Sequence, residues 1–190
     1  MNIFAVLIFT LLSSASPEKP QFFERGTSFT LDFGFQGGGI HTPDGPRLGV
    51  GVLTSLKGNI NWAYEISFVN GDDCHHDYCY DEWGVYLYGG INRYFFFTPD
   101  RRFYAILGGG LFAGINSFER GYWYNEYDNW DDDDTAIVFG PMGKASLMFD
   151  IKPVSLGVTL FLGFGISLGT ESGLEFTLPG GLSFSVHLAF

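Results

Sequence analysis

The densest group of potential metal or redox ligands in the chain is the run 74–79, which reads CHHDYC. Thiolate and imidazole groups suit zinc or copper, so this run is a candidate metal site. Its ligands would be Cys74, His75, His76 and Cys79. The spacing matches no zinc signature, and two cysteines in an exported protein most often pair because the compartment is oxidising. The sequence therefore predicts a disulfide between Cys74 and Cys79, with the metal site as its alternative.

Carboxylates form a second conspicuous group, in residues 128–134. Calcium prefers oxygen ligands, but the stretch lacks the glycine and the distant glutamate of an EF-hand loop, so we interpret it as a solvated acidic loop. The whole chain has 21 acidic and 10 basic residues and a net charge of −11. This balance excludes nucleic acid as a partner, because binding phosphates requires a basic surface. No cofactor is predicted.

The composition indicates what kind of fold must position these groups. Of the 190 residues, 46% are hydrophobic, 18% are aromatic and 16% are charged, whereas soluble domains have about 25% charged residues. Residues 3–12 form an apolar run followed by small residues, which is typical of a signal peptide cleaved after Ala15. Beyond that run, no window is long and apolar enough for a membrane-spanning helix. A β-barrel that turns one face to lipid would accommodate the apolar excess.

Strict alternation of apolar and polar side chains predicts the strands of this barrel. It is clearest in the last segment, LSFSVHLAF, in which alternate residues share one apolar face. These residues are Leu182, Phe184, Val186, Leu188 and Phe190. We predict eight strands, with bounds near 27–37, 46–56, 60–70, 83–94, 103–116, 135–148, 154–165 and 177–190. The predicted organisation is a signal peptide over 1–15, a periplasmic leader over 16–26 and a barrel over 27–190.

The connections between the predicted strands alternate in length and charge. Segments 71–82 and 117–134 are long and acidic, whereas the intervening turns are short and hold most of the basic residues. Short periplasmic turns opposite long external loops are expected of a membrane barrel. An even number of strands also leaves both ends of the chain on the periplasmic side.

If the apolar faces look outward, the polar faces must fill the interior. An eight-stranded barrel is just wide enough to be filled by side chains, and charges buried there need partners. We expect Lys144 to pair with Glu65 or Asp32, in a polar network that also includes His187. Three further residues are expected to point inward: Tyr86, Tyr88 and Asn92.

The apolar residues at every second position back from Phe190 resemble the terminal β-signal of outer-membrane proteins, which the barrel-assembly machinery reads. Together with eight strands and Gly-rich strands such as 104–114, this pattern resembles the small OmpX-, OmpA- and opacity-type barrels. The resemblance implies a closed, antiparallel, eight-stranded up-and-down transmembrane β-barrel of meander topology. It also implies residence in the outer membrane of a Gram-negative bacterium, with membrane lipids, lipopolysaccharide and the assembly machinery as partners.

The resemblance does not fix a function, because such folds carry several. We predict no catalytic residue: Ser185 and His187 share a strand face, but their order reverses the His-x-Ser motif of outer-membrane lipid hydrolases. The expected role is structural or adhesin-like, through the acidic, aromatic-rich loops 71–82 and 117–134, toward an unknown surface ligand. One alternative is a narrow, porin-like channel or small-solute translocator. The other is a secreted soluble barrel whose apolar faces point inward and bind a lipophilic ligand.

Overall fold

The computed structural model of the chain describes seven segments of residues. They are 26–37, 42–56, 58–75, 78–122, 134–151, 153–170 and 173–189. Within them, side chains are described except at 72–75, 78–80, 119–122, 134 and 189. The expected signal peptide, most of the leader and Phe190 lie outside the described residues, so their assignments stay predictions.

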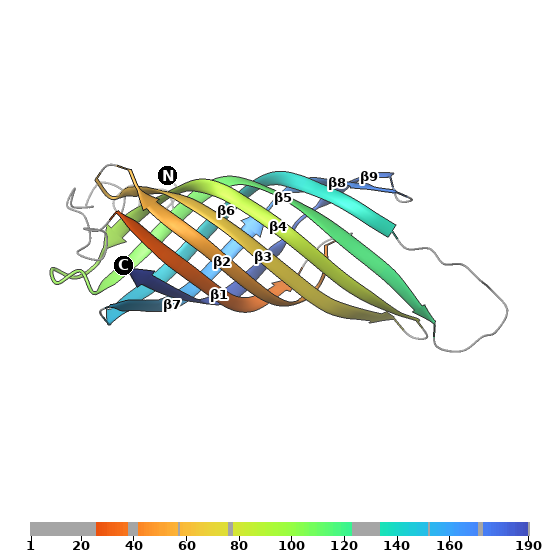
Figure 1. The fold of residues 1–190 in the computed structure, drawn as a ribbon, viewed down its shortest axis with the longest axis horizontal. Coiled ribbons are helices and arrows are strands. Elements are labelled where there is room, and N and C mark those ends of the chain that lie inside the picture. The colour runs from red at the N-terminus through yellow and green to blue at the C-terminus, as the bar shows by residue number, and fades with distance from the viewer. Residues whose placement is uncertain are drawn as a thin grey trace, which may run out of the picture.

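Ten strands form one closed antiparallel sheet (Figure 1). They are β1 (Thr27–Gly37), β2 (Gly45–Ser55), β3 (Ile60–His75), β4 (Tyr78–Phe96), β5 (Phe103–Tyr122), β6 (Asp134–Ile151), β7 (Val154–Gly163), β8 (Gly165–Gly169), β9 (Gly173–Thr177) and β10 (Gly180–Ala189). β8 continues the line of β7, and β9 continues the line of β10. The wall therefore has eight strand positions, which we call staves, and two of them consist of two strands each. Each stave pairs with its neighbour in sequence, and β1 pairs with β10 to close the ring. The predicted eight-stranded meander barrel is confirmed.

The seventh and eighth staves are interrupted side by side. Gly163 N donates to the carbonyl of Pro179 at 2.6 Å, and Phe164 N donates to the carbonyl of Pro141 at 2.9 Å. Proline has no N–H to give to a strand ladder, so the regular pairing breaks at Pro179. The eighth stave therefore starts at Gly173 and is split in two, whereas the sequence predicted an unbroken strand from 177.

The prediction that 71–82 is a long loop was wrong. β3 continues to His75 and β4 starts at Tyr78, so only residues 76 and 77 separate the two strands. β5 likewise continues to Tyr122, beyond its predicted end at 116. These strand ends reach past the ends of β1 and β2 in Figure 1. The carboxylates there lower the β-propensity that the prediction relied on.

The apolar face of the wall points outward. On β10, Leu182 and Phe184 are 55% and 48% exposed, whereas Ser183 between them is 2% exposed. Val186 and Leu188 share the outward face with them. This orientation contradicts the soluble-barrel alternative, which requires these side chains inside. No helix among the described residues is long and apolar enough to cross a membrane.

The inner wall is divided between small and large side chains. β1 and β10 contribute buried hydroxyl groups, whereas β4 and β5 contribute buried rings. The hydroxyl groups belong to Ser28, Thr30, Ser183 and Ser185, and the rings to Tyr86, Tyr88, Tyr94, Tyr104 and Phe112. Most large rings of the inner wall thus come from β4 and β5, opposite the side where β1 pairs with β10; Phe161 on β7 and His187 on β10 are also buried.

Candidate functional site

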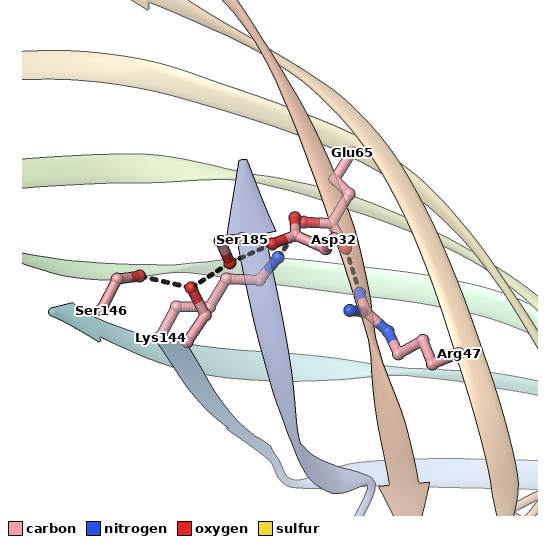
Figure 2. Close-up of polar contacts among 7 residues, drawn as sticks. Asp32, Arg47, Glu65, Lys144, Ser146 and Ser185 are labelled. Atoms are coloured by element: carbon pink, nitrogen blue, oxygen red, sulfur yellow. Dashed lines mark hydrogen bonds and ion pairs between the residues drawn. The ribbon is translucent and has the colours of Figure 1, made fainter. Parts of the chain in front are cut away.

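A cluster of four charged residues lies inside the barrel (Figure 2). Its centre is Glu65 on β3, whose carboxylate accepts hydrogen bonds from Arg47 on β2 and from Lys144 on β6. The three side chains are 8%, 4% and 11% exposed, respectively. Burial of this kind makes an isolated charge costly, so each cation is held by the shared carboxylate.

The fourth charged residue, Asp32 on β1, is held by a row of hydroxyl groups. Ser185 Oγ on β10 donates to Asp32 Oδ1. Ser185 Oγ also lies 2.6 Å from Thr159 Oγ1 on β7, which lies 2.7 Å from Ser146 Oγ on β6. Figure 2 shows this row beside the ion pairs of Glu65. The hydrogen-bonded row therefore links β1, β10, β7 and β6 through the interior.

The cluster balances its own charge and is packed against rings. The carboxylates of Asp32 and Glu65 offset the two cations, so the buried formal charge sums to zero. The Arg47 guanidinium lies 4.4 Å from the centroid of the Phe161 ring, and Lys144 Nζ lies 4.2 Å from that of the Tyr88 ring. Such cation–π contacts fix the direction of each cation. The arrangement can brace opposite walls of the barrel against each other.

The structure brings the predicted interior residues to one level of the barrel. Lys144 pairs with Glu65, and no ion pair joins it to Asp32 among the described residues. His187 is 5% exposed and lines a cavity of about 40 Å³ together with Asp32, Glu65 and Lys144. Its Nδ1 has no hydrogen-bond partner within the described part of the chain. A cavity of this size has room for ordered water.

Sequence reasoning missed Arg47. The alternation of residues 47–51 could have indicated it. Leu48 and Val50 share the apolar face, so Arg47 shares the other face with Gly49 and Gly51. The β2 pattern therefore places a single cation on the inner face. The structure shows it buried beside Glu65.

Apolar side chains pack on both sides of the charged cluster. Toward the short turns, Tyr94 and Tyr104 pack with ring centroids 5.7 Å apart, and Met148 pairs with Tyr104 across the strands. Toward the opposite end, Phe112 and Phe161 are 2% and 1% exposed. The charged layer is thus enclosed between two apolar layers.

The end of the barrel opposite the short turns carries a sheet made of β3, β4 and β5. Its strands pair from Glu82 and Phe118 out to Tyr78 and Tyr122. The register places Cys74 directly opposite Cys79. Opposite residues in an antiparallel pair have Cα atoms about 4.5–5.5 Å apart, which suits a disulfide. The side chains of 74–79 lie outside those described, so the disulfide and the alternative metal site both stay predictions.

Comparison with known proteins gives structural matches only. No protein-family model matches the chain, and no curated protein matches it by sequence. Neisserial surface protein A has a similar structure, with a TM-score of 0.50 and 13% identity, over 86% of this chain and 96% of that one. Ail, the attachment invasion locus protein of Yersinia pestis, matches with a TM-score of 0.51 and 10% identity, over 87% of this chain and 97% of that one. A major outer membrane protein of Thermus thermophilus matches with a TM-score of 0.52 and 11% identity, over 86% of this chain and 99% of that one.

At such low identity these likenesses concern the fold. The surface of the protein independently indicates a membrane protein. An outward belt of exposed leucine, isoleucine and phenylalanine side chains requires a hydrocarbon environment. A closed barrel suits this environment because β1 pairs with β10, so the described wall has no open sheet edge. The chain thus has the fold of the small eight-stranded outer-membrane β-barrels, with an outward face suited to the hydrocarbon of a membrane.

Proposed function

We propose that the barrel serves as a membrane anchor for an external contact surface with an adhesin-like role. The surface comprises the β3–β4–β5 sheet beyond the barrel wall, and the proposal extends it to the acidic sequence 123–133, which lies outside the described residues. The observation that carries the proposal is the difference in strand length around the barrel. The β2–β3 ladder ends at Val69, whereas β3 remains paired with β4 as far as His75.

This extension gives the surface a defined framework. Six further residues of β3, from Asn70 to His75, pair with β4. At about 3.3 Å per residue, they add roughly 17–20 Å of strand. A paired strand already holds its backbone in one conformation. The entropy that it loses on binding a partner is therefore smaller than the entropy that a flexible loop would lose.

The charge of this surface limits its partners. Segments 71–82 and 117–134 contain many carboxylates, and Arg120 is the single lysine or arginine in them. A surface of this sign repels polyanions and favours neutral or basic partners. Ail was solved in complex with the heparin analogue sucrose octasulfate. We expect this chain not to bind such a sulfated ligand.

Deleting the external surface tests the proposal. One variant joins β3 to β4 directly by replacing 72–81 with a two-residue turn, and a second variant also removes 123–133. Attachment of bacteria that display each variant is measured on host-cell and abiotic surfaces. We expect attachment to fall with the first deletion and to disappear with both.

The matched control alters the short turn 97–102 at the opposite end, which should leave attachment unchanged. Each variant must also show the gel migration of a folded barrel before boiling. Attachment that survives both deletions in folded protein contradicts the proposal.

A narrow channel is the second candidate function. The packed interior argues against it, because Tyr94, Tyr104 and Phe161 are each 1% exposed at levels on either side of the charged cluster. We expect the protein in planar bilayers to show no single-channel conductance. Discrete current steps would favour the channel instead.

A further inference from the structure

We propose that Arg93 binds the phosphate group of an anionic phospholipid in the periplasmic leaflet of the outer membrane. This inference concerns the end of the barrel opposite the external surface and does not depend on the proposed contact role. It starts from an unusual placement: a cation on the face of the wall that is otherwise apolar.

Arg93 is exposed and lies on the outward face of β4. Its partners across the strands are Ile60 and Leu107, whose side chains are 37% and 43% exposed on the same apolar belt. Ile60 is the first residue of β3. On the β3 side the apolar wall therefore ends beside Arg93, whereas the exposed Phe97 and Phe103 lie a few residues farther toward the short turn. This end, with its short turns, is the periplasmic end in such barrels.

The neighbouring aromatic residue fits this depth. Trp62 is 39% exposed and pairs with Ile91. This pair lies two residues farther from the short turns than the pair of Ile60 with Arg93. Tryptophan is enriched at membrane–water interfaces, where one edge of the ring meets headgroups. An arginine beside it lies at headgroup level, close to lipid phosphates.

The guanidinium is also presented in a form suited to phosphate. Its central carbon lies 5.4 Å from the centroid of the Phe95 ring. Contact with the ring fixes the position of the planar group, whose N–H groups can form the paired hydrogen bonds that bind phosphate. Within the described residues, no carboxylate forms an ion pair with Arg93.

The distribution of charge favours this leaflet over the outer one. Arg93, Arg101 and Arg102 all lie at the end with short turns, whereas the external segments are acidic. Anionic lipid headgroups at the periplasmic end therefore meet charges of opposite sign. Lipopolysaccharide phosphates at the external end meet charges of the same sign.

Lipid retention by the purified full chain tests the proposal. The protein is folded in a nonionic detergent and titrated separately with phosphatidylglycerol, phosphatidylcholine and inorganic phosphate, and bound lipid is counted by native mass spectrometry. We expect retention of phosphatidylglycerol in preference to phosphatidylcholine. Loss of a charge-assisted hydrogen-bond pair should lower phosphatidylglycerol affinity roughly tenfold in Arg93→Gln.

Two further variants make the result specific. Arg102→Gln makes the same change of charge in an exposed turn, and we expect it to keep the lipid. Arg93→Lys keeps the charge without the planar fork, and its affinity should lie between those of the native chain and Arg93→Gln. All variants are first checked for folding by gel migration without boiling.

Three results would overturn the assignment. Equal losses in Arg93→Gln and Arg102→Gln would indicate diffuse electrostatic attraction. Displacement of the lipid by millimolar inorganic phosphate would indicate a free-phosphate site. Equal retention of the two phospholipids would remove the case for an anionic headgroup.

Discussion

Lys144 on β6 forms an ion pair with Glu65 on β3, 79 residues earlier in the chain, across the interior of the barrel. Two strands, β4 and β5, separate the partners along the wall. The ion pair therefore crosses the lumen and connects two strands that are not neighbours in the sheet. Because Arg47 shares the same carboxylate, the two cations depend on one acid.

This dependence predicts an order among variants. Glu65→Gln leaves both cations buried without a carboxylate partner, and breaking a buried pair in this way costs about 3–5 kcal/mol. Lys144→Met should cost less, because Glu65 retains Arg47. Urea unfolding in lipid vesicles measures both values. Unchanged heat stability of Lys144→Met would count against this ion pair.

The hydroxyl row predicts a contrast between two serines of β10. Ser185→Ala removes the hydrogen bond to Asp32, and a hydrogen bond to a charged group contributes about 1.5–3 kcal/mol. Ser183 faces inward two residues earlier, and its Oγ has no partner among the described residues. Ser183→Ala should therefore leave the unfolding midpoint unchanged. Equal effects of the two changes would show that the row contributes nothing specific.

Two adjacent glycines of β5 predict opposite tolerance to alanine. A Cβ on Gly110 would lie 2.2 Å from the carbonyl oxygen of Gly89, and its nearest neighbours are backbone atoms, which cannot turn away. A Cβ on Gly109 would meet nothing within 4 Å. We expect Gly110→Ala to destabilise the barrel by about 1–3 kcal/mol and Gly109→Ala to fold normally. Refolding yield and urea midpoints of both variants provide the measurement, and a normally folding Gly110→Ala would refute the close approach of β4 and β5.

The turn between β4 and β5 contains a residue that glycine should replace favourably. Arg101 has φ of 58°, a left-handed conformation that strains an L-residue. Arg101→Gly removes that strain and should raise the free energy of unfolding by about 1 kcal/mol. The adjacent Arg102→Gly has no such strain to relieve and should not stabilise. A lower midpoint for Arg101→Gly would show that contacts of the arginine outweigh the strain.

The register of the external sheet predicts an oxidised cysteine pair. Thiol titration of unfolded, unreduced protein should find no free thiol, and two after reduction. Replacing both cysteines by serine should leave the barrel folded, because they lie beyond its wall, while increasing proteolysis between 70 and 83. Two titratable thiols with a bound metal would support the alternative metal site instead.

The wall of the barrel was predictable because alternation along one strand decides which side chains meet lipid. Leu182 and Phe184 show this, as do the predicted bounds of β1. The far ends of β3 and β4 were not predictable in this way, because they continue beyond the β2–β3 ladder, where no lipid-facing wall imposes alternation. Pro179 gave a local signal for the break that the prediction did not use.

The sequence predicts which residues face the interior but not which of them form contacts with one another. Alternation placed Glu65, Lys144 and His187 on inward faces. Which of them touch depends on strand tilt and stagger, which relate residues on opposite walls and leave no trace in the period of a single strand. Lys144 therefore had two equivalent candidates, Glu65 and Asp32, and the three-dimensional stagger selects the first.

The division of the inner wall bears on how the ring can be completed. Inward-facing residues of the first and last staves are mostly short, such as Ser28, Thr30, Ser183 and Ser185. Five buried rings project inward from β4 and β5, and Phe161 of β7 lies beside the seam against Gly181. When the C-terminal stave pairs with the N-terminal one, neither stave carries a phenylalanine, tyrosine or tryptophan on its inner face, and His187 is the one large ring that enters with them among the described residues. The seam can therefore close as a backbone ladder forms, without moving the rings of β4 and β5.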